Sequence, residues 1–404
     1  MMKQGYYLSA YVCVDEFQNL MDIKLRHDQT IALWEYRGDV VKLVKYWELE
    51  RISGLKQHAK AIYSKAKFND LLKQLLCEVN VELGDIIEIW GVKTIENRVD
   101  YRTYLDSRFA FHSIAHLLTA LFYDNTSPTD SCILSMALDS GLDSQFEEDA
   151  YSKFYYAGCV IKNSDISFFS VESPAKLWSY SFKKFGLREG TLMALSSAMN
   201  TKWFIPDAQM EKWLQGSFFD ESCRLTAQQL VDDVFDFVDK LDESQIGICC
   251  TNFDDRFSAY ENKLSMTMKI ISDISMKIVS RSIDSAVKKY ELDTRTTTFA
   301  LAGGFALNCP TNIALIEKYE FCSYQIPPCA SDTGIAMGIG LAAFSQLLLS
   351  KQASIRIDTA FLGQAVSSNI EKRCLLTVII LSASNKCQWS ILSKPSLRVI
   401  SWFG

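Results

Sequence analysis

The alternation of apolar and polar residues predicts that the chain begins with β-strands. Apolar side chains recur with a period near two in three early stretches, over residues 6–14, 30–36 and 40–46. The tripeptide Arg37-Gly38-Asp39 separates the last two stretches and is typical of a hairpin turn. Apolar residues at helical spacing then predict helices over residues 56–80, 109–122 and 262–290.

Further along, short apolar runs end in glycine-containing turns. We expect buried strands over residues 132–138, 297–301 and 321–326. The first two strands run into the turns Asp139-Ser140-Gly141 and Ala302-Gly303-Gly304. Helices are predicted over residues 311–318 and 332–344, and this alternation predicts a three-layer α/β architecture. The stretch 151–240 is mixed and aromatic, and we interpret it as an irregular insertion.

Composition narrows the class of protein. Of the 404 residues 48% are hydrophobic and 22% are charged, and the net charge is -6, which predicts a mildly acidic globular protein. The chain lacks the excess of basic residues that would indicate binding to nucleic acid or to an anionic membrane, so neither is an expected partner. The twelve cysteines are scattered, and the apolar run 375–381 is too short to span a bilayer. We therefore expect reduced thiols and a cytoplasmic location.

The chain has only four histidines, and two of them are four residues apart. On a helix, His112 and His116 would lie on one face and could bind one metal ion, although they could also be ordinary helical residues. With Asp139 and Asp332 they would form an N2O2 ligand set. Such a set suits Fe²⁺, Mn²⁺ or Zn²⁺ better than Mg²⁺ or Ca²⁺. The alternative is that both aspartates only cap turns.

The glycine turns suggest contact with a nucleotide. After a strand, Gly303 and Gly304 would let the backbone approach a phosphate, and a following helix would add unpaired N–H groups. The turns that contain Gly141 and Gly334 offer the same arrangement beside a carboxylate. The alternative at each position is a turn without a ligand.

The first half of the chain carries motifs of a known family. The stretch His27-Asp28-Gln29-Thr30-Ile31-Ala32-Leu33 resembles the His-Asp-Ser-Ala-Ala-x-Leu opening of the nodulation and antibiotic O-carbamoyltransferases. Glu48-Leu49-Glu50-Arg51, followed by Lys56 and His58, resembles that family's Glu-Glu-Arg-Phe…Lys-His motif. The His112/His116 pair is similar to its metal-binding His-x3-His, and Asp139-Ser140-Gly141 to its Asp-Gly-x-Gly turn.

The second half continues the resemblance in the same order. The closest likeness is residues 301–312, which resemble a motif Gly-Gly-x-Ala-Leu-Asn-x3-Asn. Residues 328–338 resemble Pro-x3-Asp-x-Gly-x-Ala-x-Gly, and Phe361-Leu362-Gly363 resembles a Tyr-Leu-Gly-Pro segment. The likeness spans roughly residues 7–372 and includes all four histidines.

This resemblance implies an actin-like ATPase fold with two pseudo-duplicated α/β subdomains around a central nucleotide and metal cleft. It implies transfer of a carbamoyl group from carbamoyl-adenylate, made from carbamoyl phosphate and ATP, to a hydroxyl of a small-molecule acceptor. The metal would be held by His112, His116, Asp139 and Asp332, and Fe²⁺ is expected in preference to Zn²⁺ or Mn²⁺. Asp139 would either coordinate the metal directly or act from the second shell. The nucleotide would contact Gly303, Gly304, Asn308, Asn312, Gly141 and Gly334.

Catalytic roles are expected for three residues of the N-terminal motifs. His27 would bind the acceptor or move its proton, because a neutral imidazole can act as a base near pH 7. Arg51 and Lys56 would contact phosphate or carbamoyl oxygens. A structural ion pair between Glu50 and Arg51 is the alternative.

We expect a first part over residues 1–130, a second part over residues 131–372 with the insertion at about 151–240, and an unmatched tail over residues 373–404. The family's Glu-Gly-Lys-x-Met-Gly-Leu-Ala appears here as residues 189–196 without its lysine. The tail stands where the family has an adenylate-forming domain, which suggests a truncated copy that depends on a separate adenylate-forming protein. An inactive nucleotide-binding or partner-binding remnant is one alternative, and a phosphotransferase or ATPase is another.

Overall fold

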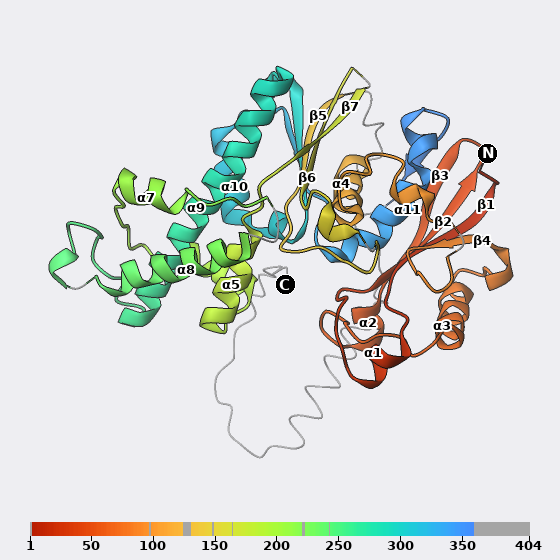
Figure 1. The fold of residues 1–404 in the computed structure, drawn as a ribbon, viewed down its shortest axis with the longest axis horizontal. Helices are drawn as coiled ribbons and strands as arrows, with labels where there is room; N and C mark the ends of the chain where they lie inside the picture. Colours follow the sequence, from red (N-terminus) through yellow and green to blue (C-terminus); the bar gives the residue numbers. More distant parts are fainter. Residues whose placement is uncertain are drawn as a thin grey trace, which may run out of the picture. The chain divides into compact units, whose positions relative to one another are not determined.

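Two separate five-stranded mixed sheets form the framework of the computed structural model (Figure 1). The structure describes residues 2–96, 98–123, 131–147, 149–163, 165–219, 223–241 and 243–358. The motif at 361–363 and the tail at 373–404 lie outside these residues. The α/β class expected from the sequence is confirmed.

The first sheet has the strand order β10-β3-β2-β1-β4. Its strands are β1 (Gly5–Tyr11), β2 (Thr30–Arg37), β3 (Val40–Glu48), β4 (Ile86–Trp90) and β10 (Ser354–Arg356). The first three form an antiparallel meander, whereas β4 is parallel to β1 and β10 is parallel to β3.

The second sheet has the order β7-β6-β5-β8-β9 and repeats the arrangement of β1 to β4, but its fifth strand lies beside β8 and not beside the meander. Its strands are β5 (Cys132–Ala137), β6 (Ala157–Lys162), β7 (Asp165–Ser170), β8 (Thr297–Ala302) and β9 (Ser323–Gln325). Strands β5, β6 and β7 form an antiparallel meander, β8 is parallel to β5, and β9 is parallel to β8. In both sheets a strand parallel to the first strand therefore follows an antiparallel meander of three.

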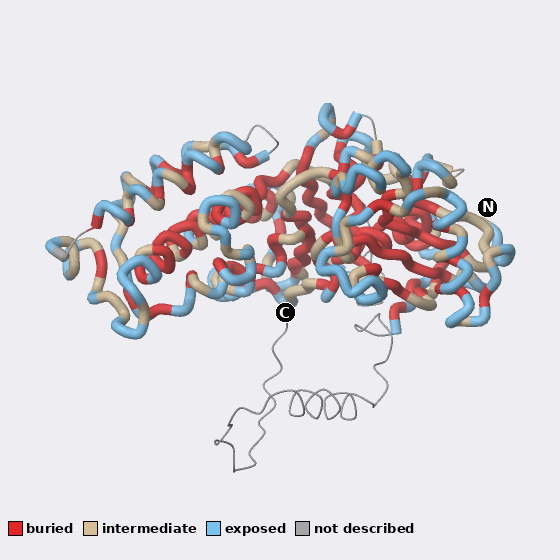
Figure 2. Tube along the Cα trace, turned by 90° about the horizontal axis from the view of Figure 1, so that it is seen from below, coloured by how far each residue is buried: buried red, intermediate tan, exposed pale blue. Residues whose placement is uncertain are grey.

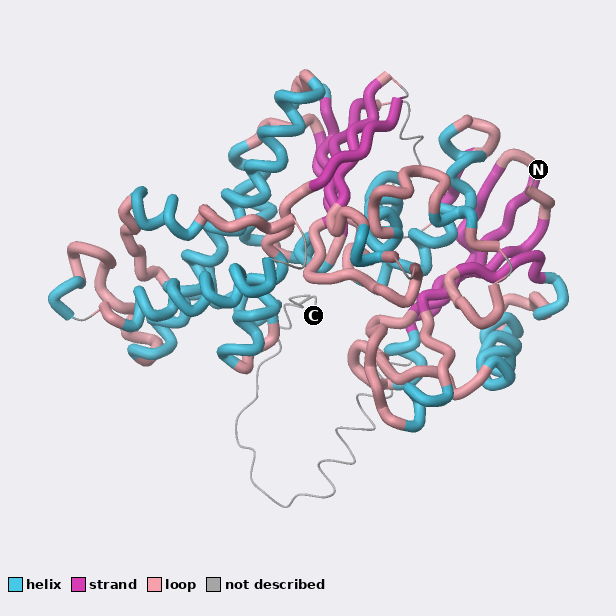
Figure 3. Tube along the Cα trace, viewed as in Figure 1, coloured by secondary structure: helices cyan, strands magenta, loops and turns pink. Residues whose placement is uncertain are grey.

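Helices cover both faces of each sheet (Figure 3). The helices are α1 (Glu16–Leu20), α2 (Leu49–Ser53), α3 (Lys65–Cys77), α4 (Phe111–Phe122), α5 (Ala175–Phe185), α6 (Glu189–Ala198), α7 (Asp207–Trp213), α8 (Cys223–Asp239), α9 (Ala259–Tyr290), α10 (Cys309–Lys318) and α11 (Ile335–Leu349). Helix α3 packs on one face of the first sheet, and α4 and α11 lie between the two sheets. Helices α5, α6, α8, α9 and α10 contribute to the core on the far face of the second sheet.

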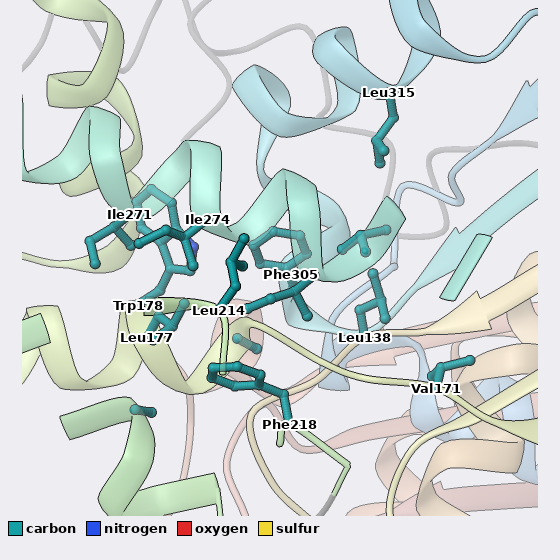
Figure 4. Packing of buried hydrophobic residues seen from close by; sticks show 14 of the residues in the cluster. Leu138, Val171, Leu177, Trp178, Leu214, Phe218, Ile271, Ile274, Phe305 and Leu315 are labelled. Carbon is teal, nitrogen blue, oxygen red and sulfur yellow. The ribbon is translucent and has the colours of Figure 1, made fainter. Parts of the chain in front are cut away.

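Each strand contributes to the layers on both sides of its sheet, because successive side chains of a strand point to opposite faces of the sheet. In β1, Leu8 and Ala10 pack with α3, while Tyr7 and Tyr11 belong to the core that contains α4 and α11. The buried residues accordingly run through both sheets and the helices between them (Figure 2). On the far face of the second sheet, Trp178 of α5 and Ile274 of α9 pack in one cluster (Figure 4).

The central helix α11 is unusually apolar. The segment Asp332–Leu349 has the length and hydropathy of a membrane span, but 78% of it is buried inside the structure. Core helices of globular proteins share this composition, so the segment is weak evidence for a membrane span.

Two expectations about elements differ from the structure. The helix predicted over 56–80 begins only at Lys65, where Ser64 caps it by accepting a hydrogen bond from the Lys67 amide. Before it, Ile62 pairs through its backbone with Cys13 and Asp15. The stretch 151–240, expected to be irregular, contains strands β6 and β7 of the second sheet as well as helices α5, α6, α7 and α8.

Candidate metal centre

Helix α4 carries both paired histidines into the space between the sheets. All twelve of its residues are buried, and His112 and His116 are 3% and 0% exposed. Their ring centroids lie 4.8 Å apart with the ring planes nearly perpendicular. The i, i+4 spacing therefore places both imidazoles on one helix face, as the sequence predicts.

Two carboxylates reach the same point from other elements. Asp139 follows the end of β5, and Asp332 opens a short 3-10 helix (Asp332–Gly334) directly before α11. His112 Nε2 lies 3.4 Å from Asp139 Oδ2, and His116 Nε2 lies 3.3 Å from Asp332 Oδ1. One donor atom from each of the four residues lies within 4.8 Å of the others, so the cluster could hold a metal ion.

The histidine nitrogens support this interpretation. Within the described part of the chain, His112 Nδ1 and both ring nitrogens of His116 are buried without a hydrogen-bond partner. An unsatisfied buried polar atom is costly, and a coordinated cation would satisfy one nitrogen of each ring.

Opposite charges dominate the electrostatics of the cluster. Burial opposes charge on His112, yet the carboxylates of Asp332 and Asp139 together raise its pKa. Burial likewise opposes ionisation of the two aspartates, but His112 and His116 keep the pKa of both carboxyls below the usual range. Both carboxylates are therefore ionised at neutral pH, which is the form that binds a cation.

Backbone amides hold one of the two carboxylates in place. The amide of Gly304 donates to Asp139 Oδ1 over 3.1 Å, and that of Gly141 donates to Oδ2 over 3.4 Å. The Ser173 hydroxyl donates to the Asp139 carbonyl oxygen over 2.6 Å. Two of the glycines expected to contact nucleotide thus orient the carboxylate of Asp139.

The carboxylate of Asp332 is bound by a tyrosine whose ring packs against an arginine. Tyr11 donates its hydroxyl proton to Asp332 Oδ2 over 3.2 Å. The guanidinium of Arg26 lies 4.5 Å from the centre of the Tyr11 ring and 4.6 Å from that of Phe146. Arg26 also forms a buried ion pair of 2.6 Å with Asp143.

His27 lies at the edge of the cluster. Its Nε2 is 3.8 Å from Asp332 Oδ2, its Nδ1 is 2.8 Å from Asp28 Oδ2, and its side chain is 55% exposed. The hydrogen bond to Asp28 outweighs desolvation and raises the pKa of His27 to about 9. The protonated ring is therefore favoured at neutral pH, in contrast to the neutral base expected from the sequence.

The two expected cations are engaged in ion pairs at the surface. Arg51, with a side chain 71% exposed, pairs with Glu48. Lys56 Nζ lies 3.4 Å from Glu50. Neither contacts the four clustered residues in the described structure. The expected alternative of an ion pair at Arg51 is found, with Glu48 as the partner in place of Glu50.

Two further glycines allow close packing of the backbone. Gly303 has φ +88°, and a Cβ there would lie 2.2 Å from the Leu138 carbonyl oxygen. A Cβ at Gly334 would lie 2.1 Å from the Cys329 carbonyl oxygen. Packing alone therefore requires glycine at both positions, whether or not a nucleotide binds nearby.

The start of α10 offers unused polar atoms. Asn308 caps this helix by accepting a hydrogen bond from the Thr311 amide, and Asn312 donates to the Ala306 carbonyl oxygen. Within the described structure, Asn308 Nδ2, Thr311 Oγ1 and Asn312 Oδ1 are buried without a partner. A ligand with complementary donors and acceptors would satisfy them.

The residues that support the two candidate carboxylate ligands are not predicted from the sequence. Tyr11 is 321 positions from Asp332, and Arg26 is 117 positions from Asp143. No local pattern links such distant residues, and the place of Arg26 directly before His27 is the only signal in the sequence.

No family model matches the chain, and no curated protein matches it either.

Proposed function

We propose that this protein is a metal-dependent O-carbamoyltransferase with an actin-like ATPase fold. The main observation that supports this proposal is the cluster of His112, His116, Asp139 and Asp332, with His27 at its edge. Support for the fold comes from the strand order, because both sheets combine an antiparallel meander of three strands with a fourth strand parallel to the first. The motif resemblance supplies the reaction.

Two imidazoles and two carboxylates fit a divalent ion such as Fe²⁺, with Zn²⁺ or Mn²⁺ as the alternatives. When bound, the ion would supply positive charge to a carbamoyl oxygen. The unsatisfied polar atoms of Asn308, Thr311 and Asn312 support a nucleotide near the start of α10.

In the proposed reaction the acceptor hydroxyl oxygen bonds to the carbamoyl carbon of carbamoyl-adenylate. The bond from that carbon to the phosphate oxygen breaks, and AMP leaves with the electron pair. The raised pKa of His27 suits a cationic ring that binds a phosphate oxygen of the departing AMP. The acceptor proton would then pass to solvent or to the departing phosphate.

One observation favours a second candidate, a protein that binds nucleotide without turnover. Arg51 and Lys56, the expected phosphate contacts, are paired with Glu48 and Glu50 at the surface. A substrate-induced movement would be needed to bring either cation to the cluster.

Metal analysis of the purified protein tests the proposal, with each candidate histidine replaced separately. His112→Ala and His116→Ala should each lose bound iron or zinc. His58→Ala is the matched control, because this half-buried histidine contacts Ser53 and lies outside the cluster. Equal metal content in all four proteins would contradict the proposal.

Turnover is tested by supplying synthetic carbamoyl-adenylate and a panel of alcohols. AMP release that depends on both an alcohol and the two histidines would support carbamoyl transfer. Nucleotide binding without AMP release would favour the second candidate. Magnesium-dependent ATP hydrolysis that survives loss of both histidines would instead identify a phosphotransferase or ATPase.

A further inference from the structure

The segment that follows β5 contacts the start of α4 as well as the metal cluster. It contains Asp139, one of the four candidate ligands, and further along Phe146 and Glu147. Glu147 Oε1 accepts a hydrogen bond of 2.5 Å from the backbone amide of Phe111, the first residue of α4. The Phe146 and Phe111 rings also pack edge to face, with centroids 5.2 Å apart. Two contacts therefore hold α4 at the residue directly before His112.

The start of α4 has no capping side chain of its own. Ala110 occupies the N-cap position without a side-chain hydrogen bond, and the first turn contains no acidic residue. The first amides of a helix have no partner within the helix, and an unpaired amide inside a protein is costly. All twelve residues of α4 are buried, so the Phe111 amide depends on a partner from the protein. Glu147 provides that acceptor, together with a negative charge that the helix dipole favours at this end.

Glu147 is itself held in place. Its carboxylate forms an ion pair with Lys153, and both side chains are only 10% exposed. Phe154, the residue after Lys153, accepts a hydrogen bond of 3.0 Å at its carbonyl oxygen from the Ala110 amide. A carboxylate that is both paired and enclosed has few orientations open to it, so the cap on the Phe111 amide has a defined geometry.

We propose that Glu147 positions His112 for metal binding by fixing the first turn of α4. This inference rests on the proposed metal-dependent function and adds a residue that does not contact the metal. A metal site requires its ligands to be held within about 0.5 Å of the productive geometry. Because a helix moves as a rigid element, a contact at its first residue restricts His112 and, one turn later, His116.

Two substitutions of Glu147 separate the cap from the charge. Glu147→Ala removes both, and it should weaken zinc binding about tenfold or more, as expected for a group that orients a ligand. Glu147→Gln keeps a carbonyl oxygen for the Phe111 amide, so it should retain most of the affinity that alanine loses. Competition with a chromophoric chelator measures all three affinities.

The affinities can contradict the proposal in two ways. Equal zinc affinity of Glu147→Ala and the unmodified chain would overturn it. A glutamine variant as weak as the alanine variant would also overturn it, because the effect would then come from the lost ion pair with Lys153 and not from the cap.

Hydrogen exchange of the Phe111 amide in chelator-treated protein provides a readout without metal. Exchange should become fast in Glu147→Ala and stay slow in Glu147→Gln, because only alanine leaves this amide without an acceptor. An unmodified chain that binds neither zinc nor iron would overturn the proposed metal centre. Slow exchange of the Phe111 amide in Glu147→Ala would overturn the role of Glu147 alone.

Glu88→Ala is the matched control, because Glu88 is also a glutamate with few exposed atoms that forms an ion pair. Its Oε2 lies 3.0 Å from Arg98 Nε and accepts a hydrogen bond of 2.7 Å from Trp90 Nε1, on strand β4 and outside the cluster. Zinc affinity and Phe111 exchange should both match those of the unmodified chain. An equal loss of zinc affinity in Glu88→Ala would show a general effect of destabilisation and would overturn the specific role of Glu147.

Discussion

Tyr11 connects a metal-ligand candidate to the first sheet. Its hydroxyl donates to Asp332, and its ring lies against Arg26. A carboxylate ligand held by a second hydrogen bond has fewer orientations to lose when a cation binds. We therefore expect Tyr11 to contribute to metal affinity without contacting the metal.

Tyr11→Phe should weaken metal binding about tenfold, which is at the low end for loss of a group that orients a ligand. Tyr7→Phe is the control, because Tyr7 lies on the same face of β1 and its hydroxyl donates to the Lys3 carbonyl oxygen, away from the cluster. Competition titrations with a chromophoric chelator would measure both affinities. Equal affinities for the two variants would show that the Tyr11 hydroxyl is dispensable.

The bond from His27 to Asp28 makes a prediction about pH. In metal-free protein, Asp28→Asn should lower the pKa of His27 from about 9 toward its ordinary value of 6.5. Because the folded-state pKa is the higher one, the protonated His27–Asp28 pair stabilises the fold fully below pH 6.5. This stabilisation should disappear as the pH rises through 9.

Asparagine suits the substitution, because Asp28 has a positive φ of 52° that asparagine tolerates. With four histidines in the chain, imidazole proton resonances would report the titration directly. Asp22→Asn is the control, since Asp22 has a φ of 51° and pairs with Lys24. An unchanged His27 titration in Asp28→Asn would rule out this cause of the raised pKa.

At this scale the sequence predicts some site residues better than others. The spacing of His112 and His116 is local, and one helix suffices to bring the rings together. Asp139 and Asp332 are predictable because a strand end and a helix start place them. The sequence offers an ion pair at Arg51 only as an alternative and with Glu50 as the partner, whereas the structure pairs Arg51 with Glu48, three residues earlier.

Among the elements, α4 and α11 make the closest helix contact near the site. A Cβ on Gly338 of α11 would lie 2.2 Å from the Ala115 carbonyl oxygen of α4. A Cβ on Gly340 would lie 2.3 Å from Trp34 Nε1. These two glycines let α11 approach both α4, which carries His112 and His116, and the first sheet.

Gly338→Ala should therefore destabilise the protein by roughly 1–3 kcal/mol, since backbone atoms must move to admit the methyl group. Gly190→Ala in α6 is the matched control, because nothing lies within 4 Å of a Cβ at that position. It should be neutral or stabilise by up to about 1 kcal/mol through helix propensity. Urea unfolding would measure both changes, and a Gly338→Ala variant as stable as the unmodified chain would contradict the packing argument.

The sequence predicts elements well where one period persists. The helix predicted over 262–290 is α9, and the strand predicted over 40–46 is β3. Errors arise where contacts distant in sequence determine the backbone. Residues 56–63 have a helical pattern, but the pairing of Ile62 with Cys13 and Asp15 holds them outside α3.

Across the whole molecule, the candidate ligands come from three separate segments between two sheets. Periodicity predicts strands but not their partners, and hence the repeated strand order could not be derived from the sequence. The three residues of β10 are too few to carry a pattern. Only the structure associates this strand with β3.

A metal that binds residues from three segments should stabilise the folded chain as a whole. At a free ion concentration of 100 times Kd, the gain would be about 2.7 kcal/mol. Zinc added to chelator-treated protein should therefore raise the Tm by a few degrees. The double variant His112→Ala/His116→Ala should show no rise, and an equal rise in that variant would assign the effect to binding elsewhere.

The contribution of α11 and β10 to the first sheet has a consequence for synthesis of the protein. Strands β1 to β4 are complete at Trp90, but α11 begins about 245 residues later. At 5–20 residues per second, a ribosome needs roughly 12–50 s to cover that interval. During this time Tyr7, Trp34 and Trp90 lack the helix that buries them. The nascent N-terminal sheet must therefore be protected or remain unfolded until α11 emerges, by which time all strands of the second sheet have been synthesised.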